Sequence, residues 1–88
     1  MDSGLSYEAE KLAARLRECE EAFEALKAAA EECRKALMDV ESGSAGPGEA
    51  ISKLSSFLEA LSKFEHELSH LAASASTILL RLSPPEGG

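Results

Sequence analysis

Apolar residues recur at alternating intervals of four and three along almost the whole chain, and this spacing constrains the fold more than any other feature of the sequence. Such a series is the heptad pattern, written abcdefg, of helices that pack side by side through positions a and d. The pattern stops only at residues 42–48, SGSAGPG, where glycine and proline cannot sustain a helix. The sequence therefore predicts two long helices joined by one short hinge over residues 42–48.

The first series lies in a helix that we predict over residues 6–41, after a lead-in at residues 1–5. Its a positions are Ala9, Leu16, Phe23, Ala30 and Leu37, and its d positions are Leu5, Leu12, Cys19, Leu26, Cys33 and Val40. Alanine forms a further column at g, consisting of Ala22, Ala29 and Ala36. Side chains this small let a neighbouring helix approach closely.

The second series lies in a helix that we predict over residues 49–83, followed by a frayed tail at residues 84–88 because two prolines stop the helix. Its a positions are Leu54, Leu61, Leu68, Ala75 and Leu82, and its d positions are Ala50, Phe57, Phe64, Leu71 and Ile78. Four more apolar residues stand at e, namely Ile51, Leu58, Ala72 and Leu79, and Leu80 stands at f, opposite the a and d positions.

The expected fold class is all-α, an antiparallel helical hairpin that assembles into a coiled coil or four-helix bundle, because the hinge is short and both apolar stripes are wider than one neighbouring helix can cover. The interface residues expected on the first helix are Leu16, Cys19, Phe23, Leu26, Ala29, Cys33 and Leu37. Those expected on the second helix are Leu54, Phe57, Leu58, Leu61, Phe64, Leu68, Leu71, Ile78, Leu79, Leu80 and Leu82.

Size and charge exclude several classes of partner. The chain has 88 residues, of which 16 are acidic and 9 are basic, and its formal net charge is −7. Binding to nucleic acid or to an anionic membrane surface needs clustered lysine and arginine, so neither is expected. No apolar run approaches the length of about 20 residues that spans a bilayer. A chain this small buries only about 60% of its unfolded surface, which makes a protein partner the expected source of further stability.

One motif points to metal chemistry. Residues His66-Glu67-Leu68-Ser69-His70 match H-E-x-x-H and resemble, over these five residues, the zinc-binding helix of the zincin metalloproteases. Two histidines at this spacing share a helix face and can hold zinc, but a catalytic site needs a third protein ligand. The only downstream carboxylate is Glu86, and heptad positions f and c place His66 and His70 on the outer face. We therefore expect no enzyme activity, no cofactor and no metal site, with metal binding through this motif as a remote alternative.

The two cysteines argue against a stabilising disulfide. Cys19 and Cys33 both occupy d positions of the first helix, four turns and about 21 Å apart, so they cannot bond to each other within it. We expect both to be small buried apolar residues in a reducing compartment. Residues 1–4 lack the basic and apolar segments of a secretion signal. A cytoplasmic location is expected, and the nucleus remains open.

These observations favour a non-enzymatic protein–protein interaction module that oligomerises or docks onto partner helices as a scaffold or adaptor subunit. The partners expected are a second copy, in a homodimer, or other helical proteins, in a hetero-oligomer. A second hypothesis makes the chain an obligate subunit of a hetero-oligomeric coiled-coil complex of the trafficking, cytoskeletal or chromosomal kind.

Overall fold

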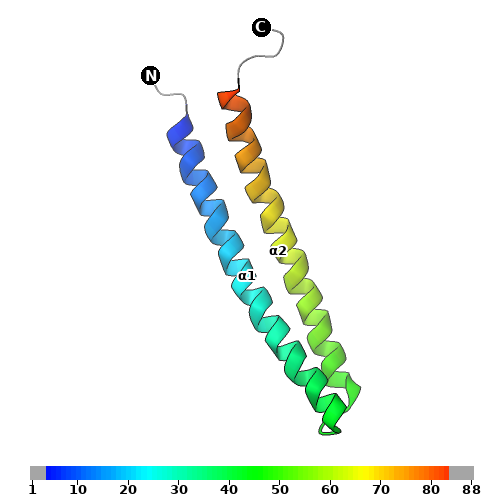
Figure 1. The fold of residues 1–88 in the computed structure, drawn as a ribbon. Coiled ribbons are helices and arrows are strands. Elements are labelled where there is room, and N and C mark those ends of the chain that lie inside the picture. The colour runs from blue at the N-terminus through cyan, green and yellow to red at the C-terminus, as the bar shows by residue number, and fades with distance from the viewer. Residues whose placement is uncertain (1–3, 84–88) are drawn as a thin grey trace.

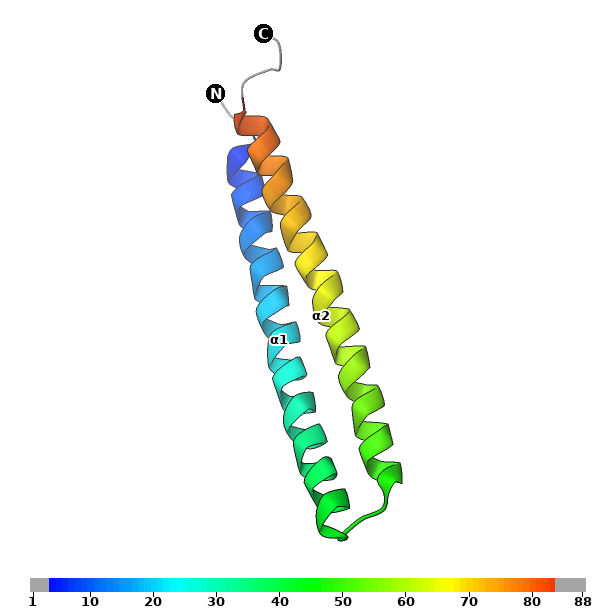
Figure 2. The ribbon, with the colours of Figure 1, turned by 45° about the vertical axis from the view of Figure 1, so that its right-hand side comes forward.

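The computed structural model describes residues 4–83, which form two antiparallel α-helices joined by a tight turn (Figure 1). Helix α1 spans Leu5–Ser42 and helix α2 spans Pro47–Leu82. The helices run side by side along their length, and the first residues of α1 and the last of α2 lie at the same end (Figures 1 and 2). The predicted all-helical hairpin is therefore confirmed.

The helix bounds differ from the expected ones by one or two residues at each end. Helix α1 begins at Leu5 and ends at Ser42, one residue beyond the predicted range at both ends. Helix α2 begins at Pro47, two residues early, because proline suits the first helical turn, where no partner exists for a backbone N–H. It ends at Leu82, one residue early. The predicted tail at residues 84–88 and residues 1–3 of the lead-in lie outside the described residues.

The turn occupies residues 43–46 and is shorter than the predicted hinge at 42–48. Gly43 adopts a left-handed conformation with φ of 82°, which glycine reaches without steric penalty, and its N–H donates to the Val40 carbonyl at 3.1 Å. The N–H groups of Ser44 and Ala45 both donate to the Asp39 carbonyl, at 2.8 and 3.2 Å. These bonds give partners to the Asp39 and Val40 carbonyls in the last turn of α1 while the chain reverses direction.

The two helices contact each other through positions d and g, and not through a and d as the heptad pattern suggested. On α1 the buried residues are Cys19 and Cys33 at d and Glu8, Ala22 and Ala36 at g. On α2 they are Ala50 at d and Ser74 at g. Each helix has only one neighbour and can bury only one stripe, and the small g residues allow the closer approach. The a columns consequently lie beside the contact and not within it.

Three contacts define how the helices are aligned. The ring of Phe23 at position a lies with its centroid 5.5 Å from that of Phe64 at position d, close to the middle of both helices. Near the turn, the Lys53 ammonium group donates to the Glu32 carboxylate at 2.7 Å, and the Cys33 thiol donates to the Lys53 carbonyl at 3.1 Å. Position a of one helix is therefore level with position d of the other throughout the hairpin.

A charged cluster closes the open end of the hairpin. Glu8 of α1 is buried, and its carboxylate oxygens lie 3.6 Å from the Arg81 guanidinium of α2 and 4.0 Å from the Lys11 ammonium group. Burial of a carboxylate is tolerated only when cations lie close to it, which explains why two of them do. The sequence pattern did not suggest a buried glutamate at this position.

The interior of the hairpin is thin. Among the described residues the buried apolar side chains are small, and no large side chain is fully enclosed. Neither helix contains, within residues 4–83, a stretch long and apolar enough to cross a membrane. Two helices in a single layer leave each large apolar residue open to at least one side.

Candidate interaction surface

The heptad geometry divides the hairpin into two opposite faces. Around a helix, position a lies next to d on one side, and position c lies next to g on the other. Because the helices are antiparallel and touch through d and g, both a columns lie on one face and both c columns on the other. The Phe23–Phe64 contact belongs to the first face, and the Glu32–Lys53 ion pair, formed between positions c and g, belongs to the second.

The first face carries large apolar side chains from both helices. We define the apolar face as the a positions of α1 together with the a and e positions of α2 that hold large apolar residues. These are Leu16, Phe23, Leu37, Ile51, Leu54, Leu58, Leu61, Leu68, Leu79 and Leu82. All of them are exposed except Leu61, which is half-buried.

The degree of exposure differs between the columns in a regular way. The exposed fractions at position a are 48% for Leu16, 45% for Phe23 and 43% for Leu68. Close to half of each of these residues therefore remains exposed within the hairpin. At position e, Leu58 and Leu79 are 62% and 65% exposed. A contiguous apolar surface of this kind is unusual for a chain without a partner and is typical of a protein contact.

Helix α2 therefore presents a second continuous stripe, at a and e, in addition to the d and g stripe that contacts α1. Apolar residues fill it at intervals of three and four from Ile51 to Leu82, and one residue, Glu65, interrupts it. The neighbouring b column of the helix consists of exposed serines, at Ser55, Ser62, Ser69 and Ser76. Apart from Glu65, the a, e and b columns of α2 between residues 51 and 82 therefore offer an approaching helix only apolar or small polar side chains.

Helix α1 borders the apolar face with charged residues. Its e column contains Glu20, Lys27, Arg34 and Glu41, all exposed. Lys27 lies at the edge of the face, with its ammonium group 5.3 Å from the centre of the Phe23 ring and 3.1 Å from the Glu24 carboxylate. The border thus contains two basic residues flanked by two acidic ones and is not acidic throughout.

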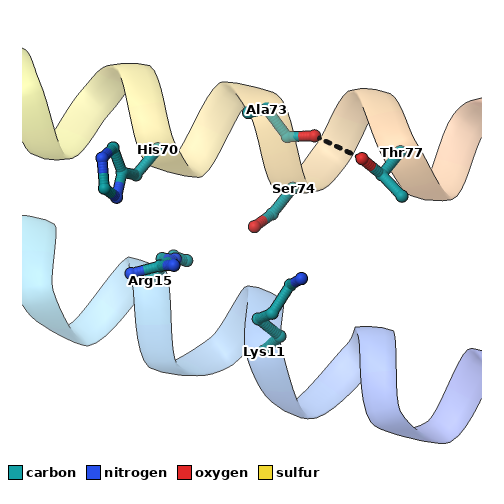
Figure 3. A pocket seen from close by; sticks show the side chains of 6 residues that line it. All are labelled: Lys11, Arg15, His70, Ala73, Ser74 and Thr77. Atoms are coloured by element: carbon teal, nitrogen blue, oxygen red, sulfur yellow. Dashed lines mark hydrogen bonds between the residues drawn. The ribbon is translucent and has the colours of Figure 1, made fainter.

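The opposite face is polar and contains shallow grooves between the helices. One groove, of about 250 Å³, is lined by Lys11, Arg15, His70, Ala73, Ser74 and Thr77 (Figure 3). Its basic groups already have acidic neighbours, because Arg15 pairs with Glu18 at 3.1 Å and Lys11 lies 4.0 Å from Glu8. The Thr77 hydroxyl donates to the Ala73 carbonyl at 3.0 Å. The groove is therefore an internally compensated surface and not a prepared anion site.

The polar face also contains an ion pair between the helices, formed by Glu32 and Lys53. The hydrogen bond from Lys53 is the main reason that the pKa of Glu32 lies below its ordinary value, and the same bond raises the pKa of Lys53. Both residues line a second groove near the turn. This pair links α1 to α2, whereas the Arg34 contact that lowers the pKa of Glu31 lies within α1.

The histidines of the H-E-x-x-H motif lie near each other, as the motif requires. The centroids of the His66 and His70 rings are 4.3 Å apart. His66 is exposed, His70 is half-buried beside the first groove, and Glu67 is half-buried at position g, facing α1. No group of three His, Cys, Asp or Glu side chains able to hold a metal ion occurs within residues 4–83. Among these residues the two histidines have no third candidate ligand beside them, and Glu86 lies outside the described residues.

Cys19 and Cys33 are both buried with free thiols, as the heptad positions predicted. Burial is the main cause that raises the pKa of the Cys19 thiol, and the nearby charges of Glu67, Glu18 and Glu20 raise it further. A thiol with a raised pKa is a poor nucleophile. The thiol contributes packing to the hairpin contact.

The structure divides the expected interface residues into two groups of different role. Those that lie in or beside the contact between α1 and α2 are Cys19, Leu26, Ala29, Cys33, Phe57, Leu61, Phe64, Leu71 and Ile78. Those that remain exposed are Leu16, Phe23, Leu37, Leu54, Leu58, Leu68, Leu79, Leu80 and Leu82. Leu80, at position f, is 77% exposed and points away from both the contact and the apolar face.

Sequence reasoning missed the contact residues at position g of α2. This column contains Lys53, Ala60, Glu67, Ser74 and Arg81, a mixed set that shows no apolar periodicity. The one available signal was the alanine column at g of α1, which indicated that a helix approaches closely on that side.

In comparisons with known proteins, no protein-family model, curated protein or solved structure matches this chain.

Proposed function

We propose that this chain is a non-enzymatic protein–protein interaction module whose apolar face docks onto helices, either of a second copy or of another protein. The observation that carries this proposal is the pair of exposed a columns on one face of the hairpin, extended by the e column of α2. Covering this face would remove large leucine and phenylalanine side chains from water, which is the dominant favourable contribution to association.

The shape of the face supports a helical partner. On α2 its apolar residues follow intervals of three and four, and on α1 they recur at position a of the heptad, which is the spacing that fits the side chains of an adjacent helix. The basic groups of the opposite face are already paired with acidic neighbours, as Arg15 is with Glu18 and Lys53 with Glu32, which favours the apolar face as the docking surface. Scaffold and adaptor subunits use surfaces of this kind.

Site-specific photo-crosslinking tests the proposal. A photoreactive phenylalanine analogue at Leu58 should crosslink to a helical segment in cells that make the protein, because Leu58 is on the apolar face. The same analogue at Leu80 is the control, since both residues are exposed leucines of α2 but Leu80 lies off the face. Equal crosslinking at both positions, or none at Leu58, would contradict the proposal. Mass spectrometry of the product shows whether the segment belongs to this chain.

A further inference from the structure

The stripe of α2 that contacts α1 and its exposed apolar stripe at a and e lie on different sides of the helix. At about 100° per residue, the centre of the a and e stripe is about 110° around the helix from the centre of the d and g stripe. A helix in a four-helix bundle meets its two neighbours at a similar angle. The d and g stripe already contacts α1, so the geometry leaves one bundle neighbour of α2 vacant.

We propose that the missing half of this bundle is a second copy of the chain, packed face to face with α1 antiparallel to the second α1 and α2 antiparallel to the second α2. This inference rests on the proposed function of the apolar face and specifies its occupant. The two copies are related by a two-fold axis that crosses the middle of the face, perpendicular to the helices.

The alignment seen inside the hairpin supplies the register of the dimer. Within the hairpin, position a is level with position d of the neighbouring helix, as Phe23 is with Phe64. The same rule applied between the two α1 helices brings Phe23 level with Leu26 of the second copy. The two-fold axis that places Phe23 opposite Leu26 also acts on the α2 pair. There it places Leu61 of one copy at the same height as Phe64 of the other. One axis therefore satisfies both helix pairs, with almost complete overlap of their lengths.

The charges at the edge of the face select this register. At the edge of an antiparallel contact, equivalent heptad positions of the two helices face each other, as the two g residues Glu8 and Arg81 do within the hairpin. In the proposed register Glu20 faces Lys27 of the second copy, and by symmetry Lys27 faces Glu20, so two opposite-charge pairs form. A shift of one heptad in one direction brings Glu20 against its own copy, which is repulsive. A shift in the other direction brings Lys27 against its own copy, which offsets part of the attraction between Glu20 and Arg34 that forms there, and it shortens the overlap of both helix pairs.

The same charges oppose the other symmetric arrangement. Placing α1 on α2 of the second copy would bring Glu20 against Glu65, the single charged residue that interrupts the a and e stripe of α2. In the proposed dimer Glu65 instead faces Leu58 of the second copy, next to the exposed serine column. Charge complementarity at the border thus favours the two-fold axis that pairs like helices.

Disulfide trapping of the full chain tests the register. The double variant Glu20→Cys/Lys27→Cys should form a covalent dimer in a glutathione redox buffer, since the two positions lie about 10 Å apart on one helix and cannot bond within a chain. Glu20→Cys alone and Lys27→Cys alone report the two shifted registers and should stay monomeric on denaturing gels. A covalent dimer formed only by Glu20→Cys/Glu65→Cys would overturn the proposed arrangement.

Charge reversal provides a second, non-covalent readout by sedimentation equilibrium. The unmodified chain should sediment as a dimer, and Glu20→Lys should weaken dimerisation by about tenfold because both border pairs become repulsive. Glu20→Lys/Lys27→Glu should restore it, and Glu21→Lys, which makes the same charge change at position f, should leave it unchanged. An unmodified chain that stays monomeric overturns the dimer. If Leu58 then crosslinks to a helix of another protein, the proposed function stands without this inference.

Discussion

The rings of Phe23 and Phe64 meet across the hairpin with their centroids 5.5 Å apart and their planes inclined by 40°. Phe64 is half-buried at position d, whereas Phe23 is 45% exposed at position a and borders the apolar face. One aromatic pair therefore belongs both to the contact that holds the hairpin together and to the surface that remains open. Phe23 therefore contributes to the stability of the hairpin and to the proposed docking surface.

A double-mutant cycle on this pair should give a coupling free energy of about 0.5–1.5 kcal/mol, as expected for tilted aromatic contacts. Phe64→Ala should lower the free energy of unfolding more than Phe23→Ala, because more of Phe64 is covered within the hairpin. Denaturant unfolding followed by circular dichroism, at one fixed protein concentration, measures both. Leu80→Ala is the control and should leave stability unchanged; independent effects of the two phenylalanines would refute the contact.

Two glycines at or near the turn should differ in how their replacement by alanine changes the free energy of unfolding. Gly43→Ala should lower the free energy of unfolding by about 1 kcal/mol, because φ of 82° strains any residue with a side chain even though no atom lies within 4 Å of the added group. Gly48→Ala, in the first turn of α2 and equally unobstructed, should raise stability by about 0.5–1 kcal/mol. Thermal melts of both variants against the unmodified chain decide this, and equal effects would show that the turn conformation is wrong.

The ion pair between Glu32 and Lys53 should make part of the stability dependent on pH. Because the pKa of Glu32 is lower in the folded chain than in the unfolded chain, the pair stabilises the hairpin above the ordinary glutamate pKa. This contribution is lost as the pH falls through the lower, folded pKa. A double-mutant cycle with Glu32→Gln and Lys53→Met should therefore show coupling near about pH 7 and none at a pH about two units below the ordinary pKa of glutamate.

Glu59→Gln serves as the control for this pH experiment, since it makes the same change in net charge at an exposed position on the outer side of α2. Its effect on unfolding should be the same in chains with and without Lys53. Coupling between Glu32 and Lys53 that persists at low pH would mean that packing, and not charge, joins the two residues.

The charged cluster of Glu8, Lys11 and Arg81 should limit how often the ends of α1 and α2 separate. Glu8→Gln removes the charge that Arg81 and Lys11 approach, and should lower the free energy of unfolding by about 1 kcal/mol. Amide hydrogen exchange should accelerate in the first turns of α1 and the last turns of α2, with the turn region unaffected. Glu10→Gln, an exposed neighbour with the same charge, is the matched control. Uniform acceleration along both helices would contradict a local role.

The two helices were predictable because their signal is local: apolar spacing specifies each helix, and Gly43 and Pro47 bound the turn. The choice of contact stripe was not predictable from the same spacing. Positions a and d carried equally strong apolar series, and position g of α2 includes Lys53, Glu67 and Arg81, which a pattern of hydrophobicity assigns to the solvent. Only the packed hairpin shows that these side chains and Glu8 lie at the contact, where Lys53 pairs with Glu32 and Arg81 with Glu8 across the two helices.

The exposed residues follow from this same choice. Leu16, Phe23 and Leu68 were expected in the interface as a single set with Cys19 and Cys33. The structure separates them, because two helices alone can bury only the d and g stripes. What spacing revealed correctly was the excess of apolar width, and what it could not reveal was which part of that width stays uncovered.

The hairpin brings the chain back to the end from which it started, since α1 begins where α2 finishes (Figures 1 and 2). A segment attached before Leu5 and another attached after Leu82 would leave from the same place, with the turn about 57 Å away. Two hairpins paired antiparallel would put these attachment points at opposite ends of one rod. The assembly would then act as a spacer of set length, holding whatever each copy carries a fixed distance apart.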